Sequence, residues 1–162
     1  LIVERFTGGK AESFTNAAMA WGNEQEPFAR AAYEARLGLF VDEVGFVPHP
    51  TIEAAGASPD GLVEDDGLVE IKCPNTATMI DTLINKTVPS KYYAQMQMQM
   101  ACTGRAWCDY VVFDPRMPVN GQLFIKRVLR DDKFVADMES EITKFLSEVD
   151  AKFETLQERL GE

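Results

Sequence analysis

The stretch that decides the fold is SPDG at residues 58–61, followed by EIK at residues 70–72. Between them lies EDDG at residues 64–67, which is rich in turn-forming residues, and Asp-Gly is among the strongest short signals for a β-hairpin. Asp60 and Glu70 lie at equal distances from the centre of this turn. Antiparallel strands joined there would set the two carboxylates roughly opposite one another, about 4.5–5.5 Å apart.

The hairpin would bring together residues with a specific chemistry. Side chains alternate along a strand, so Glu70 and Lys72 project on one face and Ile71 on the other. Two carboxylates at this separation repel unless a cation lies between them, and oxygen ligands favour a hard ion such as Mg²⁺ or Mn²⁺. A metal ion, an activated water and a positive group are the parts needed for phosphodiester hydrolysis. The alternative for any isolated Asp…Glu-x-Lys set is an acidic surface hairpin with a solvated Glu/Lys pair.

Further motifs stand around the hairpin in a fixed order. They are AWG at 20–22 with Glu26, ASPD at 57–60, EIKCP at 70–74, YYAQMQMQM at 92–100 and DYVVFDPR at 109–116. Together they resemble the phage lambda exonuclease family, the YqaJ-type viral recombinase nucleases of the PD-(D/E)xK superfamily. The resemblance runs from about residue 18 to residue 118. The PD-(D/E)xK pattern alone is degenerate, but these motifs in this order and spacing are specific.

The resemblance implies an α/β fold with a restriction-endonuclease-like core. A central mixed β-sheet would be flanked by helices, with a long C-terminal helix and one nuclease domain over residues 1–162. Family members carry a Thr-Ala-Ser motif, ahead of the tryptophan helix, that grips the DNA 5′ phosphate. This chain has no such motif. We therefore expect either that part of the family's N-terminal segment is absent or that the DNA end is bound differently.

The resemblance also assigns the site. It implies four catalytic side chains, Asp60, Glu70, Lys72 and Gln95. It implies two Mg²⁺ ions, for which Mn²⁺ can substitute, held by Glu26, Asp60, Glu70 and the Ile71 carbonyl oxygen. Asp60 would bridge the ions, while Lys72 and Gln95 would position the nucleophilic water.

The residues alone leave two of these assignments open. Glu24 and Glu26 are two apart on a predicted helix and face different ways, and only the W-G-x-x-x-E spacing of the family selects Glu26. Helical spacing puts Tyr92, Gln95 and Gln99 on one face, and the family's A-Q-x-Q pattern selects Gln95. An amide side chain both donates and accepts, so it can orient water or phosphate oxygens.

The net charge of −10 is unevenly spread along the chain. Residues 1–70 carry 4 basic and 13 acidic side chains, residues 134–162 carry 3 and 8, and residues 71–133 carry 9 and 5. Phosphate binding needs a local positive surface, and the middle segment can supply one. The candidate DNA-binding residues are Tyr92, Arg105, Arg116, Arg127 and Arg130. The alternative is a solvated surface of mixed charge.

By resemblance, the expected activity is 5′ to 3′ digestion of linear double-stranded DNA, which leaves 3′ single-stranded tails for recombination. A ring-shaped homotrimer, a single-strand-annealing partner protein and a phage or prophage gene in a bacterial host are also implied. Two alternatives remain: a related nuclease of other polarity or an endonuclease, and a non-catalytic DNA-binding or docking module.

Composition and periodicity add limits of their own. Cys73, Cys102 and Cys108 lack paired spacing, which disfavours a disulfide framework, a structural zinc site and a four-cysteine iron–sulfur cluster and favours a reducing cytoplasm. No apolar run approaches the ~20 residues of a membrane span. The apolar pattern predicts helices over 14–37, interrupted or restarted near 23–27, and over 76–86, 90–102 and 131–160. Strands are predicted over 39–47, 51–55, 58–63, 68–72, 111–113 and 123–129, with His49 at a strand end.

Overall fold

A mixed five-stranded sheet forms the centre of the computed structural model, which describes residues 1–9 and 16–161. Its strand order is β1 (Val41–Asp42), β4 (Gly61–Val63), β5 (Gly67–Lys72), β6 (Trp107–Phe113) and β7 (Leu123–Leu129). The β5/β6 pair is parallel and the other pairs are antiparallel. A separate two-stranded ribbon joins β2 (Val47–Pro48) to β3 (Gly56–Ala57). The expected central mixed sheet is confirmed.

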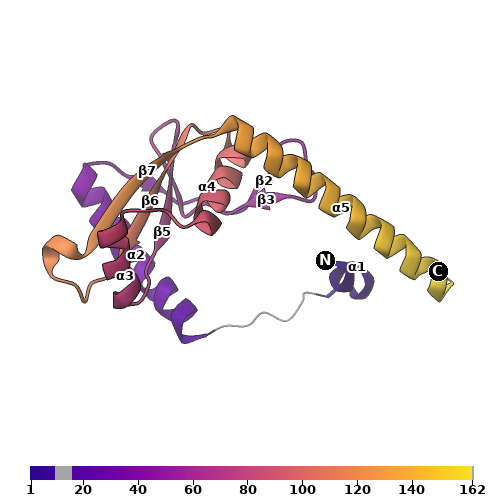
Figure 1. Ribbon diagram of the computed structural model, residues 1–162, viewed down its shortest axis with the longest axis horizontal. Helices are drawn as coiled ribbons and strands as arrows, with labels where there is room; N and C mark the ends of the chain where they lie inside the picture. Colours follow the sequence, from indigo (N-terminus) through magenta and orange to yellow (C-terminus); the bar gives the residue numbers. More distant parts are fainter. Residues whose placement is uncertain (10–15, 162) are drawn as a thin grey trace.

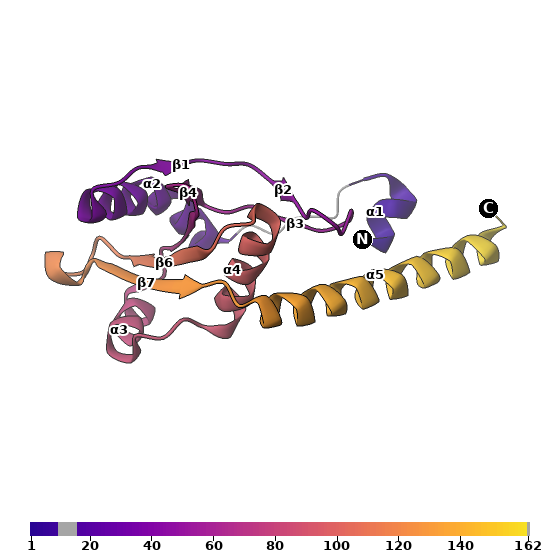
Figure 2. The same cartoon turned by 90° about the horizontal axis from the view of Figure 1, so that it is seen from above.

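Five α-helices accompany this sheet in the described residues. They are α1 (Ile2–Thr7), α2 (Ala17–Leu37), α3 (Thr76–Asn85), α4 (Ser90–Thr103) and α5 (Asp132–Leu160), with a short 3₁₀ turn η1 (Val119–Gly121). Side chains of Asn16, Asn75 and Asp131 accept hydrogen bonds from backbone N–H groups in the first turns of α2, α3 and α5, which fixes where these helices begin. Figure 2 shows α2 on one side of the sheet and α3 and α4 on the other.

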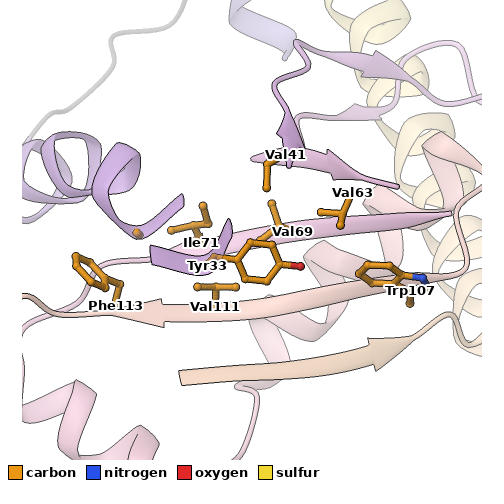
Figure 3. Packing of buried hydrophobic residues seen from close by; sticks show 9 residues of the cluster. Tyr33, Val41, Val63, Val69, Ile71, Trp107, Val111 and Phe113 are labelled. Atoms are coloured by element: carbon orange, nitrogen blue, oxygen red, sulfur yellow. The ribbon is translucent and has the colours of Figure 1, made fainter. Parts of the chain in front are cut away.

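Successive side chains of the strands point to opposite faces of the sheet, where they form two hydrophobic cores. On the α2 side, Val69 of β5 and Val111 of β6 pack with Tyr33 and Trp107 (Figure 3). On the other side, Leu68 and the opposite faces of β6 and β7 pack against methionines of α3 and α4, which are Met79, Met96 and Met100. This alternation puts Glu70 and Lys72 on the α4 side of β5, as the two-residue strand period requires.

The predicted hairpin is confirmed in detail. Gly61 pairs with Val69 and Val63 with Gly67, so the same register places Asp60 opposite Glu70. Arg105 closes the turn by donating from Nη1 to the carbonyl oxygens of the turn residues at 2.7–3.2 Å; the acceptors are Val63, Glu64 and Gly67. Gly67 is required here because the Trp107 ring lies 2.1 Å from where a Cβ would stand.

Several boundaries differ from the sequence-based expectation. The predicted strand 39–47 is reduced to β1 and the first residue of β2, and the first hairpin strand begins at Gly61 instead of residue 58. Helix α2 continues through Pro27 without restarting, and the predicted residues 14 and 15 lie outside the described part of the chain. Residues 51–55 form turns instead of a strand, because His49 organises them: its Nδ1 accepts from the N–H groups of Thr51 and Ile52. Strand β6 begins at Trp107, four residues before the predicted start at 111.

The long helix α5 extends beyond the sheet, and α1 lies beside its C-terminal half (Figure 1). The Phe6 and Phe153 rings are 4.6 Å apart, and Arg5 donates to Asp150 at 2.6 Å. Nearer the sheet, the buried His49 donates from Nε2 to Glu139 of α5 at 3.1 Å. In the part of the chain that is described, no helix combines the length and apolar character needed to cross a membrane.

Candidate active site

The hairpin brings Asp60, Glu70 and Lys72 together at one end of β4 and β5. Asp60 Oδ2 accepts a hydrogen bond of 2.7 Å from the backbone N–H of Ile71, which ties the residue before β4 to β5. Glu70 is 0% exposed, and its Oε1 forms an ion pair with the Lys72 ammonium. A fully buried carboxylate beside a second one is costly to maintain, which is typical of a site kept for chemistry.

The pKa of Asp60 is raised by its burial and by the nearby negative charge. Burial and the neighbouring Glu70 carboxylate raise it from 3.8 to about 6, although the Ile71 N–H bond opposes the shift. For Lys72, burial by itself would lower the pKa, but the attraction of Glu70 and Asp60 outweighs burial and raises it. The ammonium is therefore charged at neutral pH in this structure, and it balances one of the two carboxylates.

Glu26 belongs to α2, which packs on the face of the sheet opposite Glu70 and Lys72, and its carboxylate interacts electrostatically with Asp60 and Lys72. Burial and then the charge of Asp60 raise its pKa, which places Glu26 and Asp60 within electrostatic reach of one another. Arg30, one helical turn later, donates to Glu26 Oε1 at 2.9 Å and opposes that shift. The guanidinium of Arg116 lies 4.4 Å from the centre of the Trp21 ring, which fastens this end of α2 to the loop after β6.

The donor atoms suit a hard divalent cation in kind and in charge. No set of three or more His, Cys, Asp and Glu side chains within residues 1–9 and 16–161 stands ready-made as a metal cluster. However, Asp60 and the buried Glu70 bring two carboxylates together, and Lys72 supplies one ammonium, through its ion pair with Oε1 of Glu70. A bound divalent cation would neutralise the negative charge that one ammonium leaves over, and carboxylate oxygens are the ligands that such a cation prefers.

The three glutamines of α4 have different environments. Gln95, which the family pattern selects, is exposed to solvent. Gln97 is fully buried and bonds the backbone around the start of α5: it donates to the Leu129 carbonyl and accepts from Asp131 N–H, both at 2.9 Å. Gln99 is fully buried and donates to Glu70 Oε2 at 2.6 Å. Helical spacing grouped Gln99 with Gln95, but nothing in the sequence assigned it a contact with the site.

Tyr92 lies beside Lys72. Its ring centre is 5.1 Å from Lys72 Nζ and 4.6 Å from Lys91 Nζ, and it stacks on Tyr110 at 5.7 Å. Lys91 is exposed, so this ring and its ammonium form a positive, partly apolar surface next to Glu70 and Lys72. A surface of this kind suits a nucleic-acid strand, because phosphates meet the charge and bases or sugars meet the ring.

The four candidate arginines all have partners within the protein. Arg127 donates to the buried Asp109 at 2.8 and 2.9 Å and lies 3.4 Å from the Trp107 ring centre. Arg116 pairs with the buried Asp114, and Arg130 bonds Asp132 and the Met100 carbonyl. Arg105 closes the hairpin turn. Each therefore contributes to the fold, and any contact with DNA would be additional to that role.

Known proteins match this chain over most of its length. The family model for the YqaJ-like viral recombinase domain matches residues 2–106. A crystal structure of an alkaline exonuclease, LHK-Exo from Laribacter hongkongensis, has a TM-score of 0.94 and 49% identity over 99% of this chain and 81% of that chain. The LHK-Exo complex with dAMP gives the same values of TM-score, identity and coverage. No curated protein matches the chain.

A phage-related exonuclease from Haemophilus somnus 129PT has a TM-score of 0.72 at 17% identity, over 98% of this chain and 80% of that chain, and shows likeness of fold alone. The family match and the 49% identical neighbour confirm the expected nuclease-like fold and a deoxyribonuclease as the class of enzyme. The chain belongs to the YqaJ-like viral recombinase family, the nucleases related to phage lambda exonuclease.

Proposed function

We propose that this nuclease is an exonuclease that degrades linear double-stranded DNA from 5′ to 3′ and leaves 3′ single-stranded tails. The observation that carries the proposal is the buried Asp60/Glu70/Lys72 cluster, in which two carboxylates, one of them 0% exposed, share the single ammonium of Lys72. Within this family, such a cluster is the expected place for phosphodiester hydrolysis.

The site would use two Mg²⁺ ions, for which Mn²⁺ can substitute. Asp60, Glu70, the Ile71 carbonyl oxygen and Glu26 would hold them, and the bound ions supply an activated water and neutralise charge on the phosphate. Lys72 stays charged, so in addition to positioning the nucleophilic water it can stabilise the negative charge that develops on the attacked phosphate. Gln95, exposed on the first turns of α4, completes the set by orienting the attacking water from the solvent side.

DNA reaches the site across the surface formed by Tyr92 and Lys91, which we call the Tyr92 surface. Tyr92 and Lys91 stand next to Lys72, and Arg116 joins α2 to the loop after β6 on the Trp21 side. Arg105, Arg127 and Arg130 add positive charge farther along the segment 71–133. Because their guanidinium groups also bond buried carboxylates or backbone carbonyls, they would contact phosphates with the donor groups that remain.

The one domain over residues 1–162 would work as part of a homotrimer that encloses the duplex. The product of such an enzyme, a duplex with 3′ single-stranded tails, is the substrate of a single-strand-annealing protein, which is the proposed partner in recombination. A phage or prophage gene expressed in the bacterial cytoplasm fits this role.

The test is digestion of linear duplexes labelled at the 5′ end in one sample and at the 3′ end in another, with Mg²⁺ and with excess chelator. We expect early release of the 5′ label and late release of the 3′ label, in Mg²⁺ only. Early release of the 3′ label would establish the other polarity. Cleavage of a closed circular duplex would establish an endonuclease, and either result would overturn the proposal.

A further inference from the structure

Glu70 has a second buried partner that the proposed mechanism does not use. Gln99 on α4 is 0% exposed, and its Nε2 donates to Glu70 Oε2 at 2.6 Å. The two oxygens of Glu70 therefore differ. Oε2 is occupied by an amide from inside the protein, while Oε1 lies on the side of Lys72 and forms the ion pair with its ammonium.

The orientation of the Gln99 amide is itself fixed. Cys108 on β6 is 0% exposed, and its Sγ donates to Gln99 Oε1 across 4.0 Å, a weak bond at the long end of sulfur contacts. Burial raises the pKa of the Cys108 thiol, which keeps it protonated and able to donate. With the thiol on the oxygen side, the NH₂ group of Gln99 points at Glu70. A chain of donors thus runs from β6 through α4 to β5.

We propose that Gln99 is a positioning residue that holds Glu70 in one rotamer and leaves Oε1 as the oxygen offered to a divalent cation, an inference that rests on the proposed function. Gln99 donates from the side of Glu70 away from Lys72, so it can act without touching DNA or the reacting phosphate. Residues that bond to metal ligands in this way commonly change metal affinity about 10- to 100-fold when they are replaced.

A matched control lies two residues earlier on the same helix. Gln97 is also 0% exposed and also donates from Nε2, but to the Leu129 carbonyl, and it touches none of the proposed metal ligands. Gln97→Leu and Gln99→Leu remove chemically similar buried hydrogen bonds and keep similar volume. Both variants should lose stability, while only Gln99→Leu should lose metal affinity.

The experiment is calorimetric titration of Mn²⁺ alone, without DNA, into the wild type and the two variants, followed by cleavage assays at varied Mn²⁺. We expect Gln99→Leu to raise the Kd for Mn²⁺ and the Mn²⁺ concentration for half-maximal cleavage about 10- to 100-fold, with an unchanged KM for DNA. Gln97→Leu should leave the Kd for Mn²⁺ unchanged. Equal Mn²⁺ affinity in wild type and Gln99→Leu would overturn the inference.

A second variant keeps the inference testable if the Gln99→Leu protein does not fold. Gln99→Asn keeps an amide on α4 but is one methylene too short to reach Glu70, so it should weaken Mn²⁺ binding while folding. Unchanged Mn²⁺ affinity in a folded Gln99→Asn protein would reject the positioning role. A wild type that neither binds Mn²⁺ nor cleaves DNA would instead reject the proposed function itself, which separates the two failures.

Discussion

Neighbouring strands of the sheet each carry one buried carboxylate, and the two carboxylates differ in their hydrogen-bond and charge partners. Asp109 on β6, 1% exposed, accepts hydrogen bonds from the Tyr33 hydroxyl and from two nitrogens of Arg127 at 2.8–2.9 Å. Glu70 on β5, 0% exposed, accepts a hydrogen bond from Gln99 and pairs with Lys72, but it shares that ammonium with a second carboxylate, Asp60, beside it. The satisfied carboxylate joins α2, β6 and β7, whereas the crowded one remains available to a ligand.

The largest effect should come from Lys72, which lies beside the crowded carboxylate. Lys72→Ala removes the charge that stabilises the attacked phosphate, and turnover should fall about 10²-fold or more, a typical loss for a group that assists proton transfer or charge development. The metal-free variant should lose stability, because the buried Glu70 loses its ion pair, but Glu70 keeps its Gln99 bond and the fold should be retained. The check is kcat at saturating DNA alongside a thermal melt. Near-normal kcat would show that Lys72 has no chemical role.

Stability should respond in opposite directions to the loss of charge at Asp60, which crowds Glu70, and at Asp109. Because the pKa of Asp60 is raised from 3.8 to about 6 in the fold, the folded state binds the proton more tightly than the unfolded state. The stability that protonated Asp60 contributes to the fold is therefore lost as pH rises from about 4 to above 6. Asp60→Asn removes the charge and should stabilise metal-free protein by about 1–3 kcal/mol at pH 8, with little effect at pH 4.

Asp109→Asn should do the reverse. It takes an acceptor from Tyr33 and Arg127 and leaves buried donors poorly matched, which should cost about 1–3 kcal/mol. Denaturant unfolding of both variants at pH 4 and pH 8 measures the two effects. A destabilised Asp60→Asn protein at pH 8 would mean that the hairpin needs the charge of Asp60, and the contrast between the strands would fail.

The smallest effect should fall on DNA affinity. Lys91 is exposed beside the Tyr92 ring, so Lys91→Ala should weaken binding and reduce the slope of log K against log salt by about 1. Lys144→Ala, on the exposed side of α5, is the matched control and should leave both unchanged. Catalytically inactive protein and a duplex of fixed length serve for the measurement. Equal losses from both lysines would mean that the Tyr92 surface does not face DNA.

Local sequence signals predicted the parts of the fold that local physics controls. The hairpin register followed from the turn at 64–67 and the strand alternation, and α5 followed from its apolar spacing. Residues 51–55 could not be read correctly, because their turns depend on His49, whose ring is in turn held by Glu139 ninety positions away. A hydrogen bond between residues so far apart in the sequence produces no periodic pattern from which it could be predicted.

The site was predictable to the same extent. Asp60, Glu70 and Lys72 meet because the hairpin is local, and the sequence placed them together before any tertiary contact was known. The contact between Gln99 and Glu70 depends on how α4 packs on β5, which spacing along α4 does not determine. The arginines show the converse: their clustering in 71–133 suggested a binding surface, but Asp109 and Asp114, which pair with Arg127 and Arg116, lie in the same segment.

The most direct test of the metal-dependent Asp60/Glu70/Lys72 site is nucleotide release from linear duplex DNA by wild type and Asp60→Asn, each in Mg²⁺ and in excess chelator. We expect release by the wild type in Mg²⁺ and none in the other three conditions, with Asp60→Asn still folded. Undiminished release in chelator, or by folded Asp60→Asn in Mg²⁺, would contradict this expectation.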